Sequence, residues 1–181
     1  MKTAVIILPE GFEEIEAIAP IDILRRGEVA CTVAAHHENK FVTGKTGIQV
    51  VADKLFKEVA DTEFDLLVIP GGPGIRHLRK DRNIAGYVKA HVEAGRLVGA
   101  ICAGPTLLND AGLLNGRKYT AHFSVSAELP SIIEDQAVVH DGNIVTSRGA
   151  GTAVAFGLYL LSLIRGKQTS MEVRKAICVP A

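Results

Sequence analysis

The sequence predicts a single α/β domain with a mostly parallel central sheet. Short apolar runs rich in β-branched residues alternate with segments of helical periodicity along the 181 residues. Most of these runs are continuously apolar, which is typical of strands that helices bury on both faces. We find no internal repeat, low-complexity segment or linker. We therefore expect one doubly wound, flavodoxin-like domain over residues 1–181, with three α/β/α layers.

The first half of the chain contains clear strand and helix signals. β-branched and apolar residues predict strands at 3–8, 29–35 and 65–70. Residues 15–26 have helical apolar spacing, which Pro20 interrupts. In segment 41–51, Gly44 and Gly47 stand between β-prone residues, which predicts a small hairpin.

The second half continues the alternation. Strands are predicted at 96–101, 118–121, 137–140 and 143–147. Helices are predicted at 83–94, 151–165 and 170–177. The dipeptide Asp141-Gly142 is a hairpin turn signal, so we expect the last two strands to be antiparallel neighbours.

Charge, hydropathy and cysteine content exclude several classes of protein. The 20 basic residues balance 20 acidic ones, so no nucleic-acid or other polyphosphate partner is indicated. The most apolar segment, 149–164, is too short to span a bilayer and suits a core helix, so we expect no membrane association. No signal-peptide pattern opens the chain, and its three cysteines are widely spaced, which favours a reducing, cytoplasmic location.

Cys102 is the most informative single residue. It follows an apolar strand, directly precedes a helical pattern, and has small residues, Ala100 and Gly104, two positions away on either side. This is the layout of a nucleophile elbow, a sharp strand-to-helix turn that exposes one reactive side chain. A thiol at a helix N-terminus faces unpaired N–H groups, which predicts a stabilised thiolate. Pro105 fits the first helical turn.

Three glutamates follow the first strand. Glu13 and Glu14 are expected to be solvated partners of a helix dipole, whereas Glu16, flanked by Ile15 and Ala17, can point inward. Near a thiolate, the pKa of such a carboxyl would rise, so that it keeps a proton and donates a hydrogen bond to sulfur. The residue pattern leaves both an inward and an outward Glu16 open.

Other residues at strand ends complete a candidate site. Gly71 and Gly72 let backbone N–H groups approach a ligand and, with the N–H of Ala103, form an oxyanion hole; an ordinary tight turn explains them equally well. His122 ends another predicted strand, where it can orient or deprotonate the thiol, or serve only in packing. The chain has no CxxC or HExxH spacing, so no metal site is indicated, and we expect Cys31 and Cys178 to be packing residues.

Together, these motifs resemble the DJ-1/ThiJ/PfpI superfamily, and specifically its DJ-1/ThiJ branch. The matching stretches run in family order and span nearly the whole chain: residues 11–17, 68–72, 100–105, 120–122 and 146–152. The segments with sequence GFEEIEA and AICAGP are specific to that branch. The resemblance implies the fold of the class I glutamine amidotransferase-like superfamily and a homodimer.

The resemblance also implies roles for individual residues. Cys102 would be the nucleophile or redox centre, Glu16 its protonated hydrogen-bond partner, and His122 the nearby histidine. Gly72 and Ala103 would supply the oxyanion-hole amides. Phe123 and Ala150 depart from the family pattern, since many relatives have proline at both positions, and they change the rigidity of the loops around His122.

The expected function follows from this resemblance and from what the chain lacks. Amidotransferase relatives carry a late His-x-Glu, and protease relatives carry histidine directly after the cysteine; this chain has neither. The resemblance implies a cofactor-free glyoxalase or deglycase that acts on small dicarbonyls or glycated groups. The alternative is an oxidative-stress sensor or redox-regulated chaperone that works through oxidation of Cys102.

Overall fold

The structure is a computed structural model that describes residues 1–180. Seven strands form one central sheet in the order β5-β2-β1-β6-β7-β9-β8. All neighbouring strands in this sheet are parallel except β8 and β9, which are antiparallel. The strands are β1 (Thr3–Leu8), β2 (Ala30–Ala35), β5 (Lys54–Leu55), β6 (Leu66–Ile69), β7 (Leu97–Ile101), β8 (Val138–Asp141) and β9 (Ile144–Ser147). The mostly parallel sheet and the antiparallel final pair confirm the sequence prediction.

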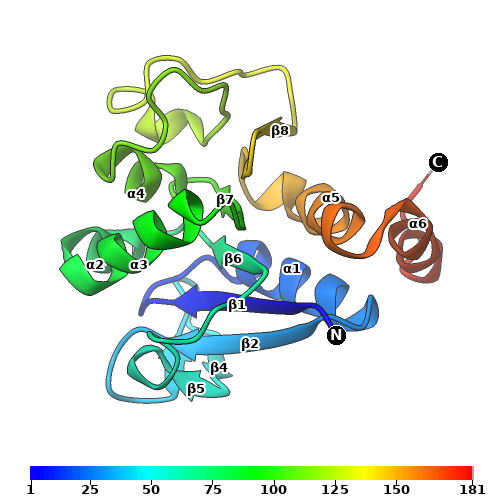
Figure 1. Cartoon of the computed structure of the whole chain (residues 1–181), viewed down its shortest axis with the longest axis horizontal. Helices are drawn as coiled ribbons and strands as arrows, with labels where there is room; N and C mark the ends of the chain where they lie inside the picture. Colours follow the sequence, from blue (N-terminus) through cyan, green and yellow to red (C-terminus); the bar gives the residue numbers. More distant parts are fainter. Residues whose placement is uncertain (181) are drawn as a thin grey trace.

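Helices cover both faces of the sheet and complete three layers (Figure 1). One layer contains α1 (Glu14–Arg26), α5 (Ala153–Arg165) and α6 (Lys167–Ala176). The opposite layer contains α2 (Ile75–Lys80), α3 (Arg82–Glu93) and α4 (Pro105–Asp110). In Figure 1, α6 lies outside α5 at the C-terminal end of the molecule.

The core divides into two apolar clusters, one on each side of the sheet. Along β1, Ala4, Ile6 and Leu8 pack into the cluster beneath α1 and α5. Val5 and Ile7 pack into the other cluster, beneath α2, α3 and α4. This alternation follows from the two-residue period of a strand, and it explains why buried parallel strands are apolar at every position.

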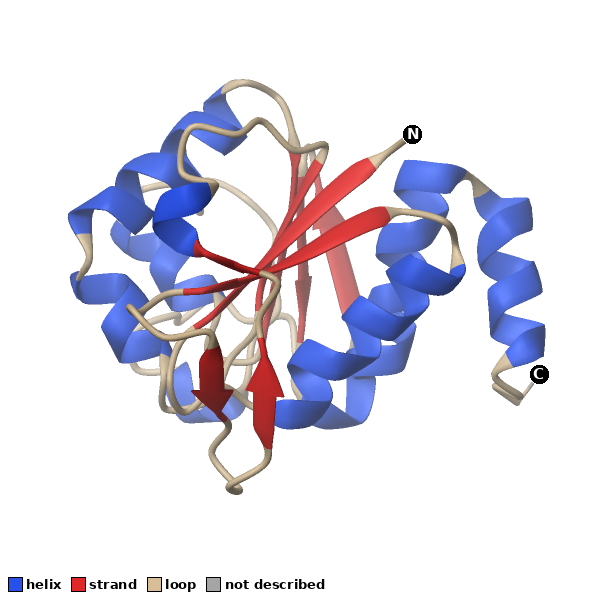
Figure 2. Cartoon of the chain, turned by 90° about the horizontal axis from the view of Figure 1, so that it is seen from below, coloured by secondary structure: helices blue, strands red, loops and turns tan. Residues whose placement is uncertain are grey.

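A separate hairpin of β3 (Phe41–Thr43) and β4 (Gln49–Val51) projects from the edge of the domain, as Figure 2 shows. Its position confirms the hairpin predicted at 41–51. The turn of the hairpin lies against the start of α1, because Lys45 donates its backbone N–H to Phe12 O and Thr46 donates to the Glu14 carboxylate. The hairpin therefore contributes to the surroundings of the first helical turn.

The predicted strand at 118–121 is wrong. Only an isolated bridge joins Tyr119 to Ile132. The backbone N–H of Lys118 donates to Asp141 Oδ2, and that of Thr120 donates to Thr146 Oγ1. Side-chain acceptors thus satisfy these groups in place of a strand ladder, so the segment can be apolar and extended without joining the sheet.

Two other elements differ from expectation. Helix α1 continues through Pro20 without a break, because its buried face packs on α5, where Gly157 leaves room beside Pro20. The short helix α2 and the strand β5 have no counterpart in the sequence prediction; α2 has too few residues for helical periodicity to be seen.

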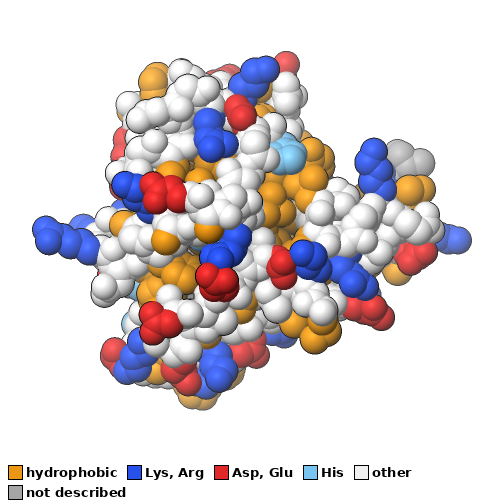
Figure 3. Space-filling model, viewed as in Figure 1, with side chains coloured by type: hydrophobic (Ala, Val, Ile, Leu, Met, Phe, Trp, Pro, Cys, Tyr) orange, Lys and Arg blue, Asp and Glu red, His pale blue; other side chains and the backbone are white. Residues whose placement is uncertain are grey.

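The surface carries mixed charges. On the face drawn in Figure 3, positive and negative side chains are interspersed and hydrophobic side chains show between them. Within residues 1–180, none of the helices has the length and apolar character needed to cross a membrane.

Candidate active site

Cys102 occupies a strained turn between β7 and α4. Its φ is +64°, in the left-handed region that non-glycine residues rarely adopt. The N–H of Cys102 donates to Ser147 O at 2.9 Å, and the N–H of Gly104 donates to Ile101 O at 2.8 Å. Pairing of β7 with both β6 and β9 holds this turn at the centre of the sheet. Such strain is a feature of functional sites, and the geometry is that of a nucleophile elbow.

The glycines around the elbow leave no room for a larger side chain. A Cβ atom on Gly71 would lie 2.7 Å from Cys102 Cβ and 2.7 Å from Glu16 Oε2. On Gly104 it would lie 2.7 Å from Ile69 O, and on Gly72 it would lie 2.6 Å from the backbone nitrogen of Glu13. The close approach of β6, β7 and the start of α1 therefore depends on the missing side chains.

Glu16 points inward, which resolves the alternative that the residue pattern left open. It lies in the first turn of α1, and only 1% of its surface is exposed. Its Oε2 accepts a hydrogen bond from the Gly71 N–H at 3.0 Å, and a Cβ atom on Gly71 would lie 2.7 Å from both Glu16 Oε2 and Cys102 Cβ, so the carboxyl group lies beside Cys102. Burial raises the pKa of Glu16 to about 7, and the negative charge of Glu13 adds to this effect.

The pKa of Cys102 is raised to about 12, contrary to the stabilised thiolate expected from the helix end. Burial is the largest cause, followed by the charge of Glu16 and the hydrogen bond to it. The backbone N–H groups of Gly72 and Ala103, which reach the sulfur, lower the pKa but do not outweigh burial. The six-residue helix α4 begins only at Pro105, so the positive end of its dipole does little to lower the pKa of Cys102.

Glu16 and Cys102 therefore act as one titrating pair. Two negative charges in this buried site repel each other strongly, so the pair retains a proton near neutral pH. When Cys102 holds it, Glu16 is a carboxylate. When Glu16 holds it, the sulfur is a thiolate that faces the N–H groups of Gly72 and Ala103 without an opposing charge. The structure thus gives the thiol an immediate proton acceptor.

The three backbone amides divide between the two groups. The N–H groups of Gly72 and Ala103 reach the sulfur, whereas the N–H of Gly71 donates to Glu16. Gly71 therefore orients the carboxyl group rather than contributing to an oxyanion hole, which differs from the expectation for its amide.

His122 lies beside this pair and lines the same pocket. Its backbone N–H donates to Cys102 O at 3.0 Å. The ring Nδ1 accepts a hydrogen bond from the Ser124 N–H at 3.2 Å and lies 2.8 Å from Ser124 Oγ. Because Nδ1 is an acceptor there, the neutral ring carries its proton on Nε2 and is a donor on that side. A Cβ on Gly149 would lie 3.3 Å from His122 Cδ2 and 3.8 Å from Glu16 Oε1, so both side chains converge on Gly149.

A pocket of about 410 Å³ connects these groups. Its walls also contain charged and polar residues that the sequence analysis did not single out: Lys45, Arg79, Thr106, Ser124 and Glu128. They come from the hairpin, α2, α4 and the loop after His122, and no local motif links them. Only the tertiary structure brings them together.

Glu13 and Glu14 are buried, which corrects the expectation that both are solvated. Glu13 caps α1 by accepting the Glu16 N–H at 2.8 Å, and it lies 3.9 Å from Lys45 Nζ. Glu14 accepts hydrogen bonds from both the backbone and the hydroxyl of Thr46. The hairpin covers this side of the helix, which the sequence of α1 cannot reveal.

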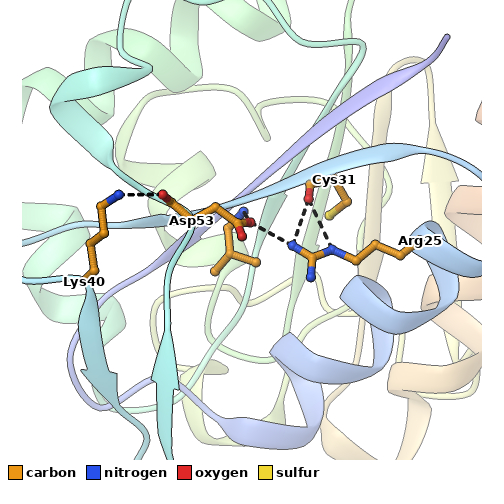
Figure 4. A network of polar contacts seen from close by, with 5 residues as sticks. Arg25, Cys31, Lys40 and Asp53 are labelled. Atoms are coloured by element: carbon orange, nitrogen blue, oxygen red, sulfur yellow. Dashed lines mark hydrogen bonds and ion pairs between the residues drawn. The ribbon is translucent and has the colours of Figure 1, made fainter.

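The other cysteines lie outside the site. Cys31 is buried in β2, as expected, where burial raises the pKa of its thiol to about 12. Its carbonyl oxygen accepts hydrogen bonds from Arg25, which also pairs with Asp53 at 2.7 Å (Figure 4). Cys178 is exposed near the C-terminus, so its expected role in packing is wrong. Among residues 1–180, no cluster of three or more His, Cys, Asp or Glu side chains has the geometry of a metal site.

Comparison with known proteins agrees with this geometry. The model of the DJ-1/PfpI family matches residues 2–163. The chain belongs to the DJ-1/PfpI family. The crystal structure of Drosophila melanogaster DJ-1beta superposes with a TM-score of 0.96 at 35% identity, and the match covers 99% of each chain.

Two curated relatives in the DJ-1/PfpI family carry names that describe an activity. A Caenorhabditis elegans protein named glutathione-independent glyoxalase is 34% identical over 98% of this chain and 97% of its own length. A Thermococcus kodakarensis protein named deglycase is 35% identical over 88% of this chain and 98% of its own length.

Proposed function

We propose that this chain is a cysteine-dependent enzyme that converts small dicarbonyls to 2-hydroxy acids, as a glyoxalase does. The observation that carries the proposal is the adjacent pair of Cys102 and buried Glu16, which line one pocket together with Gly72 and Ala103. The names of the C. elegans and T. kodakarensis relatives support this class of activity.

The first step forms a carbon–sulfur bond. The Cys102 thiolate, formed while Glu16 holds the shared proton, attacks the aldehyde carbon of methylglyoxal or glyoxal. The electron pair of the carbonyl bond moves to oxygen, near the N–H groups of Gly72 and Ala103. Transfer of the Glu16 proton to that oxygen gives a neutral hemithioacetal and leaves Glu16 as a carboxylate.

The second step moves hydrogen from one carbon to the next. Glu16, now a carboxylate with its pKa raised to about 7, is a suitable base to remove the proton from the carbon bonded to sulfur. The electron pair shifts toward the second carbonyl, whose oxygen gains a proton, with His122 Nε2–H as a donor on that side. Glu16 returns its proton to the second carbon, and the hydroxyl group on the first carbon gives up its proton to His122 Nε2 as the thioester carbonyl forms. The first carbon is oxidised and the second reduced, so the step needs no external oxidant.

The third step releases the product. Water attacks the resulting thioester, the carbon–sulfur bond breaks, and a 2-hydroxy acid leaves while Cys102 regains its proton. With a glycated amine as substrate, the sulfur would first displace the amine from the same carbon, and the amine would leave with a proton. The later steps are then identical, so one site supports both the glyoxalase and the deglycase reaction.

The charges in the pocket suit a neutral substrate. Lys45 lies 3.9 Å from Glu13, and Arg79 is paired with Asp110 and Glu128. Each of these cations in the pocket wall thus faces a carboxylate. A small uncharged dicarbonyl fits these walls better than a substrate with several negative charges.

A second candidate function is redox sensing, or a redox-regulated chaperone, through Cys102. The same Glu16 proton and the same N–H groups that suit an oxyanion also suit the oxygens of a cysteine sulfinate. Peroxide would oxidise the thiolate first to a sulfenate and then to a sulfinate, with one water released at each step. The two functions differ in turnover.

The deciding measurement is lactate formation from methylglyoxal by the purified protein. We expect turnover by the wild type, and a loss of at least about 100-fold in Cys102→Ser, because serine is a much weaker nucleophile. Cys178→Ser, which changes only an exposed cysteine, should keep full activity. Absence of lactate in the wild type, with peroxide adding two oxygens at Cys102 alone, would overturn the enzyme proposal in favour of sensing.

A further inference from the structure

Arg79 joins three separate parts of the fold through its guanidinium group. It extends from α2 and binds Asp110, at the end of α4, through two hydrogen bonds of 2.6 and 3.0 Å. The same side chain donates to Glu128 Oε2 at 2.6 Å. Only 26% of the Arg79 side chain is exposed, so these contacts are partly shielded from water.

Glu128 belongs to the loop that forms one wall of the active-site pocket. This loop, residues 122–128, carries His122 and Ser124 and contains only a single turn of 3-10 helix, Phe123–Val125. Phe123, Ser124 and Glu128 are exposed, and Val125 is half-buried. Buried Leu129 anchors the end of the loop and half-buried Val125 packs against the core, whereas Phe123 is 70% exposed.

The chemistry of arginine suits this junction. A planar guanidinium presents several N–H donors in a fixed geometry and can bind two carboxylates at once. Asp110 holds the guanidinium group of Arg79 in place from α4, the helix that follows Cys102 and ends at Asp110. Glu128 binds the same guanidinium group from the loop, so the loop is held against α2.

We infer that Arg79 is a positioning residue that keeps the 122–128 loop closed over Cys102. In this role it sets the placement of His122 and limits how large a molecule reaches the sulfur. The catalytic part of the inference rests on the proposed dicarbonyl activity, whereas the closure of the loop does not.

The test uses Arg79→Lys and Glu128→Gln in a Cys178→Ser background. Lysine keeps the positive charge but lacks the planar group that binds two carboxylates, and Glu128→Gln removes the negative charge of Glu128 at an exposed position. Arg76→Gln is the matched control, since Arg76 is exposed on the same helix. The first readout is the rate at which a bulky fluorescent maleimide labels Cys102, assigned by peptide mass mapping, at low salt and at 1 M NaCl.

We expect labelling of Cys102 to be about fivefold faster in both variants, because an opened loop exposes the sulfur for part of the time. High salt should speed labelling of the wild type and of Arg76→Gln, in which the ion pair is intact, and change Glu128→Gln little, because that variant has no carboxylate at position 128. In methylglyoxal turnover, kcat/KM should fall about fivefold, mainly through a higher KM, because binding requires the closed wall.

Equal labelling rates in the wild type, Arg79→Lys and Glu128→Gln would overturn the inference, whatever the effect on turnover. If no protein, including the wild type, forms lactate, the proposed enzyme function fails but the labelling rates still decide whether Arg79 closes the loop.

Discussion

At the scale of single residues, the site depends on one proton held between Glu16 and Cys102. Burial is the largest cause of the raised pKa of both groups, and the charge of Glu16 raises the pKa of Cys102 further, whereas the interaction with Cys102 lowers the pKa of Glu16. The pair therefore differs from a low-pKa thiolate activated by a helix end. In the proposed reaction, Glu16 and Cys102 exchange this proton when the thiolate forms.

This pair makes a prediction about stability and pH. Glu16 binds its proton more tightly in the folded chain, where its pKa is about 7, than in the unfolded chain, where 4.5 applies. Its contribution to folding is therefore fully present below the unfolded pKa and is lost as pH rises through 7. Between about pH 5 and 8, we expect the free energy of unfolding of the wild type to fall by about 2 kcal/mol more than that of Glu16→Gln.

Urea denaturation at a series of pH values measures this difference. Comparison with Glu16→Gln cancels groups common to both proteins, such as His91, whose pKa burial lowers and whose effect has the opposite sign. Parallel pH profiles for the two proteins would show that Glu16 is not protonated more tightly in the fold.

At the scale of elements, the site exists because β6, β7 and α1 approach each other more closely than side chains normally allow. Gly71 lies two residues after the end of β6, at the point where the elbow and the first turn of α1 meet. Helix α1 is likewise kept continuous through Pro20 by its packing on α5. Packing between elements thus overrides local preference at both places.

Gly71→Ala tests this close approach. We expect a loss of about 2 kcal/mol of stability and at least about a tenfold loss of turnover, because the new methyl group displaces Cys102 or Glu16. Gly86→Ala is the matched control: it lies in the exposed interior of α3 with open space around it, and should gain about 0.5–1 kcal/mol with unchanged turnover. Urea denaturation and the lactate assay measure both variants. Full activity in Gly71→Ala would contradict the steric argument.

At the scale of the whole molecule, the surface formed by α1 and the hairpin contains large apolar side chains that are exposed to solvent. Ile15 and Ile18 on α1 are 55% and 40% exposed, and Ile48 in the adjoining hairpin is 57% exposed. The hairpin lies against this helix through Thr46 and Glu14. Exposed apolar side chains on adjoining elements are typical of association surfaces, and the family resemblance implies a homodimer.

We therefore predict a mass near twice 19.3 kDa in size-exclusion chromatography with light scattering. Ile18→Glu combined with Ile48→Glu should shift the protein to a monomer, because buried unpaired charges oppose association. Ala90→Glu, an exposed change on α3 in the opposite layer, should leave the mass unchanged. A monomeric wild type would contradict the prediction.

The sequence alone predicted the fold class and the turn geometry at Cys102. Continuous apolar runs and helical periodicity depend on near neighbours in the chain, and they predicted the parallel sheet, the 41–51 hairpin and the antiparallel final pair. The small residues around Cys102 predicted the elbow because a tight turn also depends only on near neighbours in the chain. The strand at 118–121 was predicted wrongly because an apolar extended segment reads the same whether its partners are strands or side chains.

The tertiary structure decided the direction of Glu16, the pKa of Cys102 and the membership of the pocket wall. These depend on residues far apart in the chain: the Gly71 amide lies 55 positions from Glu16, and Glu128 lies 49 positions from Arg79. Burial and the charge of a distant neighbour outweighed the local helix end in setting the pKa of the thiol. Electrostatic and steric effects act through space, so they became visible only when the chain was folded.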